Sequence, residues 1–330
     1  DLLNAGPVLT EDEWVNVIAE LSHNRDLLTP NLRNRMLKSV VKQGMPDSVR
    51  PFLFALLASE YSDMDSPTNS EHDRKVYDPI QARISLDADI LDQIDKDVDR
   101  TYFPPLEVTP EGISPHLSMG ERTAIIIKQQ PLRDAARNVL AVYAYKNPSI
   151  GYVQGMHSIV ASLVHVFLSS PSDNTSLGNI TLKGEESVLK AWEGLSAEKC
   201  KIWGIESVTY ESEELKKRLK KTDHELYHKF FHSGIPAVAY FAQFFLTLGT
   251  HMTPVHLSPK LLDLLFLPDV NPLPSLILGA ILSQKAHILS LPTEESLFAY
   301  MKHSLMKTVF EQSSLGSILL LEDLPQQSSP

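Results

Sequence analysis

The stretch LDADILDQIDKDVDRTYFPP, residues 86–105, decides the fold class of this chain. Its apolar residues recur three or four positions apart, as on one face of an α-helix. They are Ile90, Leu91, Ile94 and Val98. The prolines at positions 104 and 105 end such a helix, because proline lacks the backbone N–H that a helix interior needs. The stretch therefore predicts a helix with Arg100 at its end.

Helical periodicity continues over most of the chain, and the alternating runs that are typical of strands are few. Apolar stripes at helical spacing lie within residues 14–21, 37–41, 51–60, 132–143, 156–167, 261–266 and 273–291. Asn147-Pro148 ends one of these helices, since a residue before proline avoids helical backbone angles. We therefore predict an all-α, multi-helix domain with two helical lobes.

Two polar segments separate the predicted helices. Residues 62–75 lack periodicity and predict a surface loop. Residues 169–186 are rich in Ser, Asn, Asp and Gly, which bury little apolar surface, and they predict a mobile insertion. The predicted organisation is an N-terminal helical extension at 1–36, an N-terminal subdomain at 37–170, a flexible insertion at 171–190, a C-terminal helical subdomain at 191–315 and a tail at 316–330.

The segment after residue 215 carries helix signals and two clusters of ionisable residues. Thr222 and Glu225 have capping-box spacing and predict a helix that closes at Gly234, after which Pro236 suits the first turn of another. Three histidines recur every four residues along this helix, at His224, His228 and His232. A pair of such histidines can bind zinc, but no carboxylate or cysteine is placed to complete a tetrahedral shell, so we expect no metal site.

The second cluster is basic and consists of Lys216, Lys217, Arg218, Lys220 and Lys221. We interpret this basic cluster as a solvated helix face. Docking on an anionic membrane surface or an acidic partner is the alternative.

Charge and cysteine content exclude several classes of protein. Thirty basic against 41 acidic residues give a formal net charge of −11, which argues against nucleic-acid binding because phosphate contacts need clustered cations. Cys200 is the only cysteine, so no intrachain disulfide can form, and a reducing, cytoplasmic compartment is expected. The apolar runs are too short to span a bilayer, so no transmembrane segment is expected. The start lacks signal-peptide features and an initiating Met, which suggests a domain excised from a longer protein.

Several motifs of autonomous enzymes are absent from the sequence. It has no GxxxxGK[ST] or GxGxxG loop, so we expect no nucleotide cofactor of its own. It also lacks HExxH, paired CxxC and GxSxG motifs. We therefore expect a protein that acts on a protein partner.

Two short segments place polar side chains at predicted helix ends. Asp97 and Arg100 are three residues apart and share one helical face, so the carboxylate can hold the guanidinium. Gln154 follows a predicted tight turn, and its amide both donates and accepts hydrogen bonds, which suits the orienting of a water molecule. A simple surface ion pair and a simple helix cap remain open as alternatives.

Together these segments resemble the TBC domain of Rab GTPase-activating proteins, whose signatures are IxxDxxRT and YxQGM. The first signature is matched by Ile94, Asp97, Arg100 and Thr101, and the second by Tyr152, Gln154, Gly155 and Met156. The run GMPDSVR at 44–50 resembles the family's GIPxxxR motif, and residues 219–230 resemble its LxxxDxxLxxxF run. Phe54 and Leu262 stand where the family usually has tryptophan.

The resemblance implies an all-helical domain that accelerates GTP hydrolysis by a GTP-bound Rab-family GTPase. Arg100 would neutralise charge on the transferred phosphoryl group, and Gln154 would position the attacking water. Supporting roles are implied for Asp97, Thr101, Tyr152, Gly155 and Arg50. The partner would bring GTP and Mg²⁺, so the chain needs no cofactor of its own.

The resemblance also implies a cytoplasmic protein of vesicle trafficking that is recruited to endomembranes through its partner. The alternative function is a helical GTPase-binding scaffold that has no effect on hydrolysis.

Overall fold

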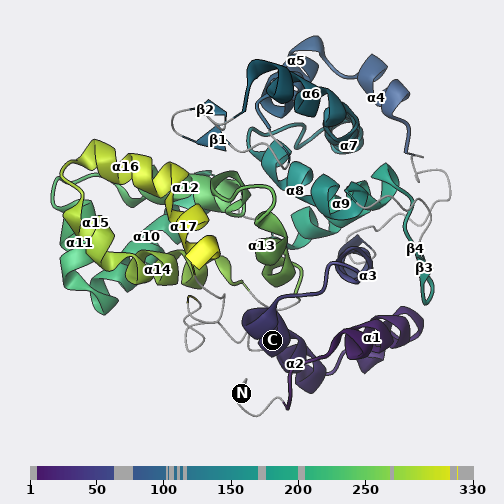
Figure 1. Ribbon diagram of the computed structural model, residues 1–330, viewed down its shortest axis with the longest axis horizontal. Helices are drawn as coiled ribbons and strands as arrows, with labels where there is room; N and C mark the ends of the chain where they lie inside the picture. The colour runs from purple at the N-terminus through teal and green to yellow at the C-terminus, as the bar shows by residue number, and fades with distance from the viewer. Residues whose placement is uncertain are drawn as a thin grey trace. The chain divides into compact units, whose positions relative to one another are not determined.

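The computed structural model of the chain describes residues 6–62, 77–101, 103, 108–109, 112–113, 117–169, 176–199, 205–267, 271–312 and 318. Regular structure in these residues is almost entirely helical, which confirms the predicted all-α class (Figure 1). The described strands form two short antiparallel hairpins, β1 (Val108–Thr109) with β2 (Gly112–Ile113) and β3 (Ser176–Leu177) with β4 (Ile180–Thr181). Apart from Ser62 and Ile318, the predicted surface loop and tail lie outside the described residues.

The helices group into two compact units. The N-terminal unit comprises Leu9–Leu32 and Met45–Glu198. Its helices are α1 (Glu11–His23), η2 (Arg25–Leu27), α3 (Arg50–Ser62), α4 (Pro79–Ser85), α5 (Ala88–Asp99), α6 (Met119–Lys128), α7 (Gln130–Lys146), α8 (Met156–Leu168) and α9 (Glu185–Lys199).

The C-terminal unit comprises the chain up to Val8, Arg33–Gly44 and the chain after Glu198. It contains most of α2 (Pro30–Gln43) together with α10 (Ile205–Thr222), α11 (His224–Phe231), α12 (Ala237–Leu246), η4 (Thr250–Met252), α13 (Ser258–Leu265), α14 (Leu273–Ser283), α15 (Lys285–Ser290), α16 (Glu294–His303) and α17 (Leu305–Gln312).

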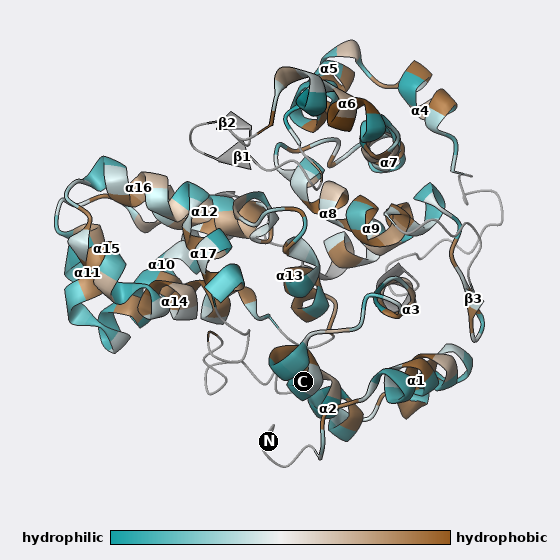
Figure 2. Cartoon of the chain, in the orientation of Figure 1, coloured by the Kyte–Doolittle hydropathy of each residue, from teal (hydrophilic) through white to brown (hydrophobic). Residues whose placement is uncertain are grey.

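Helix α1 illustrates how local sequence signals produce these helices. Thr10 and Glu13 form a reciprocal capping box, in which each side chain accepts a hydrogen bond from the other residue's backbone N–H. Trp14, Ile18 and Leu21 are buried on one side of the helix, and α1 carries both hydrophobic and hydrophilic residues (Figure 2). Packing of the buried stripe supplies most of the stability of such a helix.

Helices α7 and α8 form the centre of the N-terminal unit. α7 packs against α4, α5, α6 and α8, and α8 also packs against α5 and α3. Val139 and Leu140 of α7 and Ile159 of α8 are fully buried. The predicted stop of α7 is confirmed, because Asn147 caps the helix and donates from its amide to the carbonyl of Tyr143 at 2.9 Å.

The packing of α9 shows that the boundary between the two units lies later in the chain than predicted. The ring of Trp192 is fully buried, and its centroid lies 5.3 Å from that of Tyr143 in α7. A Cβ at position 194 would lie 2.4 Å from the carbonyl oxygen of Ala58, so Gly194 allows α9 to pack closely on α3. α9 therefore belongs to the N-terminal unit.

The two units consequently divide after Glu198, whereas the predicted division lay within residues 171–190. Residues 37–44, which the prediction placed in the N-terminal subdomain, group with the C-terminal unit. In the described part of the predicted mobile insertion, the structure has instead the hairpin of β3 and β4 and the first residues of α9. Polar composition therefore indicates neither this hairpin nor which unit the next helix joins. That choice depends on buried residues of α9 such as Val188 and Trp192.

The start of α11 corrects the predicted cap. Thr222 is the last residue of α10, and its hydroxyl donates to the carbonyl of Arg218 at 2.9 Å. Asp223 is the N-cap instead, because its carboxylate accepts from the backbone N–H groups of Glu225 at 3.1 Å and Leu226 at 3.0 Å. The predicted pairing of Thr222 with Glu225 is therefore wrong. A carboxylate is the better acceptor there, since the N-terminus of a helix carries partial positive charge.

The predicted helix at 273–291 is divided into α14 and α15, which meet at Gln284. Among the described helices, none has both the length and the apolar character that a membrane span requires.

Candidate functional site

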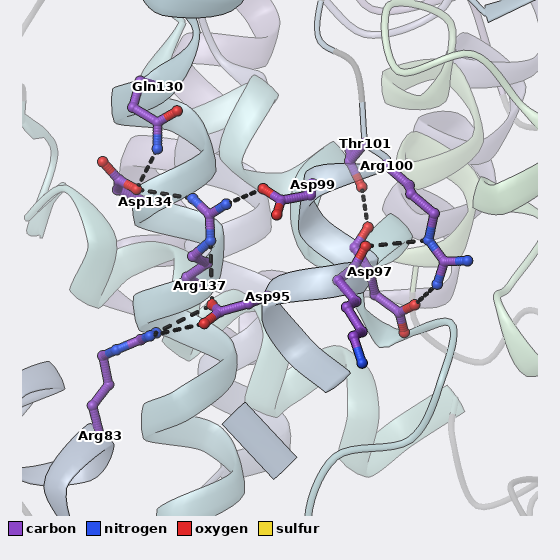
Figure 3. A network of polar contacts seen from close by, with 10 residues as sticks. Arg83, Asp95, Asp97, Asp99, Arg100, Thr101, Gln130, Asp134 and Arg137 are labelled. Atoms are coloured by element: carbon purple, nitrogen blue, oxygen red, sulfur yellow. Dashed lines mark hydrogen bonds and ion pairs between the residues drawn. The ribbon is translucent and has the colours of Figure 1, made fainter. Parts of the chain in front are cut away.

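Arg100 lies at the C-terminal end of α5, where it presents an anchored but exposed guanidinium. Its side chain is 68% exposed, whereas that of its partner Asp97 is 3% exposed. The Nη2 atom pairs with Asp97 Oδ1, and Nε donates to the carbonyl of Lys96 at 3.2 Å (Figure 3). A guanidinium has five N–H donors, and these bonds use two. The remaining N–H groups of Arg100 have no acceptor among the described residues.

Asp97 is the buried centre of the site. Its Oδ1 accepts from Arg100, and its Oδ2 accepts from the hydroxyl of Tyr152 at 2.7 Å. Nδ1 of His157 lies 3.7 Å from the same Oδ2. Removing a carboxylate from water is costly unless it is paired and hydrogen-bonded, so these partners fix the carboxylate in place. Asp97 thereby connects α5 to the residues at the start of α8.

Tyr152 links the buried carboxylate to the turn before α8. Its hydroxyl donates to Asp97 and lies 3.2 Å from Nδ1 of His157. Burial, followed by the hydrogen bond to Asp97 and the charge of that carboxylate, raises the pKa of Tyr152 above its usual value. The hydroxyl therefore stays protonated at neutral pH and acts as a hydrogen-bond donor.

A tight turn positions Gln154 at the beginning of α8. The N–H of Gly151 donates to the carbonyl of Asn147 at 2.8 Å. Gly155 is the N-cap of α8 and has φ +110°, in the left-handed region that residues with a Cβ disfavour. Gln154 is exposed, and its amide has no hydrogen-bond partner in the described part of the chain.

The hydrogen bond between Tyr152 and Asp97 brings the two predicted segments together. Tyr152 precedes Gln154 by two residues, and Asp97 precedes Arg100 by three. Thr101 completes this arrangement, because its hydroxyl donates to the carbonyl of Asp97 at 3.2 Å and closes the last turn of α5. One buried cluster therefore supports both exposed side chains.

Arg50 contributes to a local turn. It is buried, donates from Nη2 to the carbonyl of Met45 at 2.7 Å and pairs with Asp47. Arg50 is also the first residue of α3. These contacts close the turn that leads into α3.

Comparison with known protein families agrees with this arrangement. The model of the Rab-GTPase-TBC domain matches residues 47–289, well over half of the chain. The chain belongs to the Rab-GTPase-TBC domain family. The matched range includes both segments of the site, and the resemblance seen in the sequence is confirmed.

Two curated proteins with sequence similarity to this TBC domain are much longer than the chain. It is 21% identical over 237 residues to the GTPase-activating protein GYP5 of Eremothecium gossypii, which covers 72% of the chain and 23% of that protein. It is 50% identical over 40 residues to the TBC domain-containing protein C1952.17c of Schizosaccharomyces pombe, which covers 12% of the chain and 6% of that protein. The chain thus spans less than a quarter of each relative.

Two solved structures share the fold of this TBC domain. The Chlamydomonas flagellar RabGAP TBC domain superposes with a TM-score of 0.58 at 17% identity, over 94% of this chain and 95% of that one. The Ypt/Rab-GAP domain of Gyp1p superposes with a TM-score of 0.57 at 13% identity, over 95% of this chain and 97% of that one. At these identities the likeness concerns the fold alone.

The basic cluster lies in α10, and the three spaced histidines lie in α11 and at its C-cap, His232. Within the described residues, no group of three or more His, Cys, Asp or Glu side chains could hold a metal ion. In the basic cluster, Lys217 pairs with Glu214 at 2.6 Å, Arg218 donates to Ser275 at 3.2 Å and Lys220 lies 5.3 Å from the ring centroid of Tyr227. These contacts favour a solvated helix face that packs against its own neighbours.

Two residues of this TBC domain that contact the site or its helix are not predicted by any pattern in the sequence. His157 lies beside Tyr152 and Asp97. Arg137 of α7 pairs with Asp95 at 3.3 Å and with Asp99, both on α5 (Figure 3). The contacts of Arg137 span about 40 residues of sequence, so no local spacing could reveal them. His157 follows Met156 of the second motif directly, but one histidine at a helix start is not a signal by itself.

Proposed function

We propose that this TBC domain activates GTP hydrolysis by a Rab-family GTPase and supplies Arg100 and Gln154 in trans. The observation that carries the proposal is the exposed Arg100 guanidinium, which a buried Asp97 joins through Tyr152 to the turn that exposes Gln154. Membership of the Rab-GTPase-TBC domain family supports a Rab GTPase as the partner, and the description of one relative as a GTPase-activating protein supports the activity.

Arg100 has the chemistry that a phosphoryl-transfer transition state requires. Its free N–H groups can bind phosphate oxygens in a planar, forked geometry, and a guanidinium is a permanent cation. Because charge builds up on those oxygens during transfer, an arginine supplied in trans is worth on the order of 10³ to 10⁵ in rate. Asp97 fixes one side of the guanidinium while the other side stays available.

Gln154 would orient the attacking water. An amide can accept a hydrogen bond from the water and donate one to a phosphate oxygen or to the partner. Its exposure and lack of partners among the described residues leave both functions available. The N–H of Met156 donates to the carbonyl of Val153 at 3.1 Å across Gln154, so the amide would be presented with limited freedom.

The partner would be the GTP-bound form of the GTPase and would bring both the nucleotide and Mg²⁺. A cytoplasmic domain that meets its partner at endomembrane surfaces fits this activity. The contribution of this chain is then limited to positioning and electrostatics.

The test is single-turnover GTP hydrolysis by a panel of purified Rab proteins, with the wild-type chain, Arg100→Ala and Gln154→Ala compared side by side. We expect stimulation of at least one Rab by the wild type and loss of most of it in both variants. A useful control is Arg33→Ala, a charge removal in a different unit of the chain. Stimulation that survives in both Arg100→Ala and Gln154→Ala would contradict the assigned residues.

Binding without stimulation across the panel would favour the alternative, a scaffold. Phe54 and Leu262, which replace tryptophans of the family pattern, are fully buried and fill core positions. These substitutions therefore do not by themselves favour the scaffold.

A further inference from the structure

We infer that His157 is a positioning residue for Arg100, and that it donates from a protonated Nδ1 to Tyr152 and thereby orients Asp97. The kinetic part of this inference rests on the proposed function. The placement of the proton on Nδ1 does not.

The position of His157 in the fold gives it contact with the centre of the site. It is the second residue of α8, and its side chain is 10% exposed. Nδ1 lies 3.2 Å from the hydroxyl oxygen of Tyr152 and 3.7 Å from Asp97 Oδ2. The first distance is within hydrogen-bond range and the second is beyond it, so the tyrosine oxygen is the direct partner.

The direction of the Tyr152 hydroxyl proton determines the tautomer of His157. The hydroxyl of Tyr152 has a single proton, which it donates to Asp97 Oδ2 at 2.7 Å. A carboxylate is a stronger acceptor than a neutral imidazole nitrogen, so this proton stays directed at Asp97. Toward His157 the tyrosine oxygen can only accept. Nδ1 must therefore carry a proton for the contact to be a hydrogen bond.

The resulting chain of bonds crosses three parts of the N-terminal unit. His157 of α8 donates to Tyr152 of the preceding turn, Tyr152 donates to Asp97, and Arg100 of α5 donates to the other oxygen of Asp97. Each bond fixes the orientation of the next acceptor. Without the bond from the His157 ring, the tyrosine oxygen keeps its hydrogen bond with the backbone N–H of His157 but loses the side-chain contact that holds it toward Asp97.

The bond between His157 and Tyr152 also spans the turn that carries Gln154. Residues 152 and 157 flank Val153, Gln154, Gly155 and Met156, so the side-chain bond closes a short loop that contains the exposed amide. A loss of this bond would loosen the support of both Arg100 and Gln154. We expect this loss to lower the hydrolysis rate at saturating domain concentration and to leave the affinity for the GTPase nearly unchanged. A misplacement of about 1 Å can cost about 100-fold in rate without removing a binding contact.

Two substitutions at position 157 separate a positioning role from simple packing. His157→Asn keeps an N–H donor close to the place of Nδ1, whereas His157→Phe keeps a planar ring without any donor. His165→Phe is the matched control, since His165 lies two turns further along α8 and its ring bonds to Ser169. All are compared with the wild type on a responsive Rab, by single-turnover hydrolysis over a range of domain concentrations.

We expect His157→Phe to lower the saturating rate by about 10-fold to 100-fold with little change in the half-saturating concentration. His157→Asn should recover most of the rate, and His165→Phe should match the wild type. Equal rates for His157→Phe and the wild type, or equal losses in the Asn and Phe variants, would overturn the positioning role.

A second measurement on the wild-type chain does not depend on any GTPase. Nitrogen NMR of histidine-labelled protein distinguishes a protonated Nδ1 from a protonated Nε2 in a neutral ring. We expect the His157 ring to carry its proton on Nδ1, and Tyr152→Phe to weaken that preference. A neutral His157 protonated on Nε2 would overturn the inference, whereas a wild-type domain that stimulates no Rab would contradict the proposed function and leave the tautomer result intact.

Discussion

At the scale of single residues, the donor geometry of Arg100 leads to a prediction that differs from one based on its positive charge alone. Lysine would keep the positive charge, but its compact ammonium cannot bond Asp97 and a phosphate group in one planar fork. We expect Arg100→Lys to lose most of the stimulation that Arg100→Ala loses, about 10³-fold or more in single-turnover rate. Because the buried Asp97 loses its guanidinium partner in both variants, the thermal midpoint should fall below that of the wild type, more for Arg100→Ala than for Arg100→Lys, which keeps a cation.

The control for this prediction is Lys96→Arg, a charge-conserving change in the exposed last turns of the same helix. It should leave the rate unchanged. If Arg100→Lys kept more than about a tenth of the wild-type rate, positive charge alone would be sufficient. The planar, forked arrangement of N–H donors would then not be needed.

Individual contacts of the site could be predicted only where they are local. Asp97 and Arg100 are three residues apart on a helix, so periodicity predicts that their side chains meet. Tyr152 and Asp97 are 55 residues apart, and the sequence alone offers no physical reason for their hydrogen bond. The family resemblance placed Tyr152 in a supporting role, but the contact with His157 depends on how α8 begins, which only the folded chain determines.

At the scale of elements, the orientation of α5 depends on Arg137 of α7. This guanidinium is 14% exposed and pairs with Asp95 and Asp99 of α5 and with Asp134 of α7 (Figure 3). Asp99 directly precedes Arg100, so the ion pair between Arg137 and Asp99 fixes the end of the helix that carries Arg100. A single residue thus ties both helices together beside the site.

We expect Arg137→Gln to lower the free energy of unfolding by about 1 to 2 kcal/mol, because it leaves three carboxylates close together without their shared cation. The same variant should lower the saturating hydrolysis rate, since the end of α5 gains freedom. Urea unfolding and single-turnover kinetics measure the two effects. Arg83→Gln, which breaks only the 3.1 Å pair with Asp95, is the control and should affect the rate less. Equal effects of the two variants on rate would exclude a special role for the contact with Asp99.

The cap of α11 gives a prediction that separates the observed structure from the sequence-based expectation. Asp223 accepts two backbone hydrogen bonds and pairs with Lys285 at 2.7 Å. Asp223→Ala should therefore reduce stability by about 1 kcal/mol or somewhat more, as is typical of a lost N-cap. Thr222→Ala should cost clearly less, because Thr222 ends α10. The thermal midpoints of the two variants test this prediction. A larger loss of stability in Thr222→Ala than in Asp223→Ala would support the capping box of Thr222 with Glu225 instead.

Helix positions were predictable because buried stripes such as Trp14, Ile18 and Leu21 of α1 repeat at helical spacing. The ends of the helices, and the unit to which each helix belongs, were less predictable. Asp223 and Thr222 are both good cap residues, and the choice between them depends on where α10 ends. The assignment of α9 to the N-terminal unit depends on contacts of Trp192 with Tyr143, which periodicity cannot give.

At the scale of the whole molecule, the two compact units have different tasks in the proposed function. Every residue of the proposed site, from Asp97 to His157, lies within the N-terminal unit. The family match extends to residue 289 and therefore into the C-terminal unit. We infer that the domain is a single family module whose catalytic contribution comes from one unit. The stability of each unit can then be probed separately from the chemistry of the site.

Tyr240 in the C-terminal unit provides such a probe through pH. Its hydroxyl oxygen is buried and has no hydrogen-bond partner among the described residues. Burial, followed by the negative charge of Glu294, raises the pKa of Tyr240 to about 12. An unfolded chain ionises tyrosine near pH 10, so the folded form binds more protons above that pH. Its contribution to stability is therefore present below about pH 10 and is lost as the pH rises toward 12.

Replacing Tyr240 with phenylalanine should remove this part of the alkaline destabilisation. At pH 7 we expect Tyr240→Phe to be as stable as the wild type or slightly more so, because no hydrogen bond is lost with the hydroxyl. Between pH 9 and 11 its thermal midpoint should fall less steeply than that of the wild type. Tyr210→Phe, at an exposed position, should follow the wild-type curve and serves as the control. Parallel curves for Tyr240→Phe and the wild type would mean that water reaches the Tyr240 hydroxyl and that its burial does not control its ionisation.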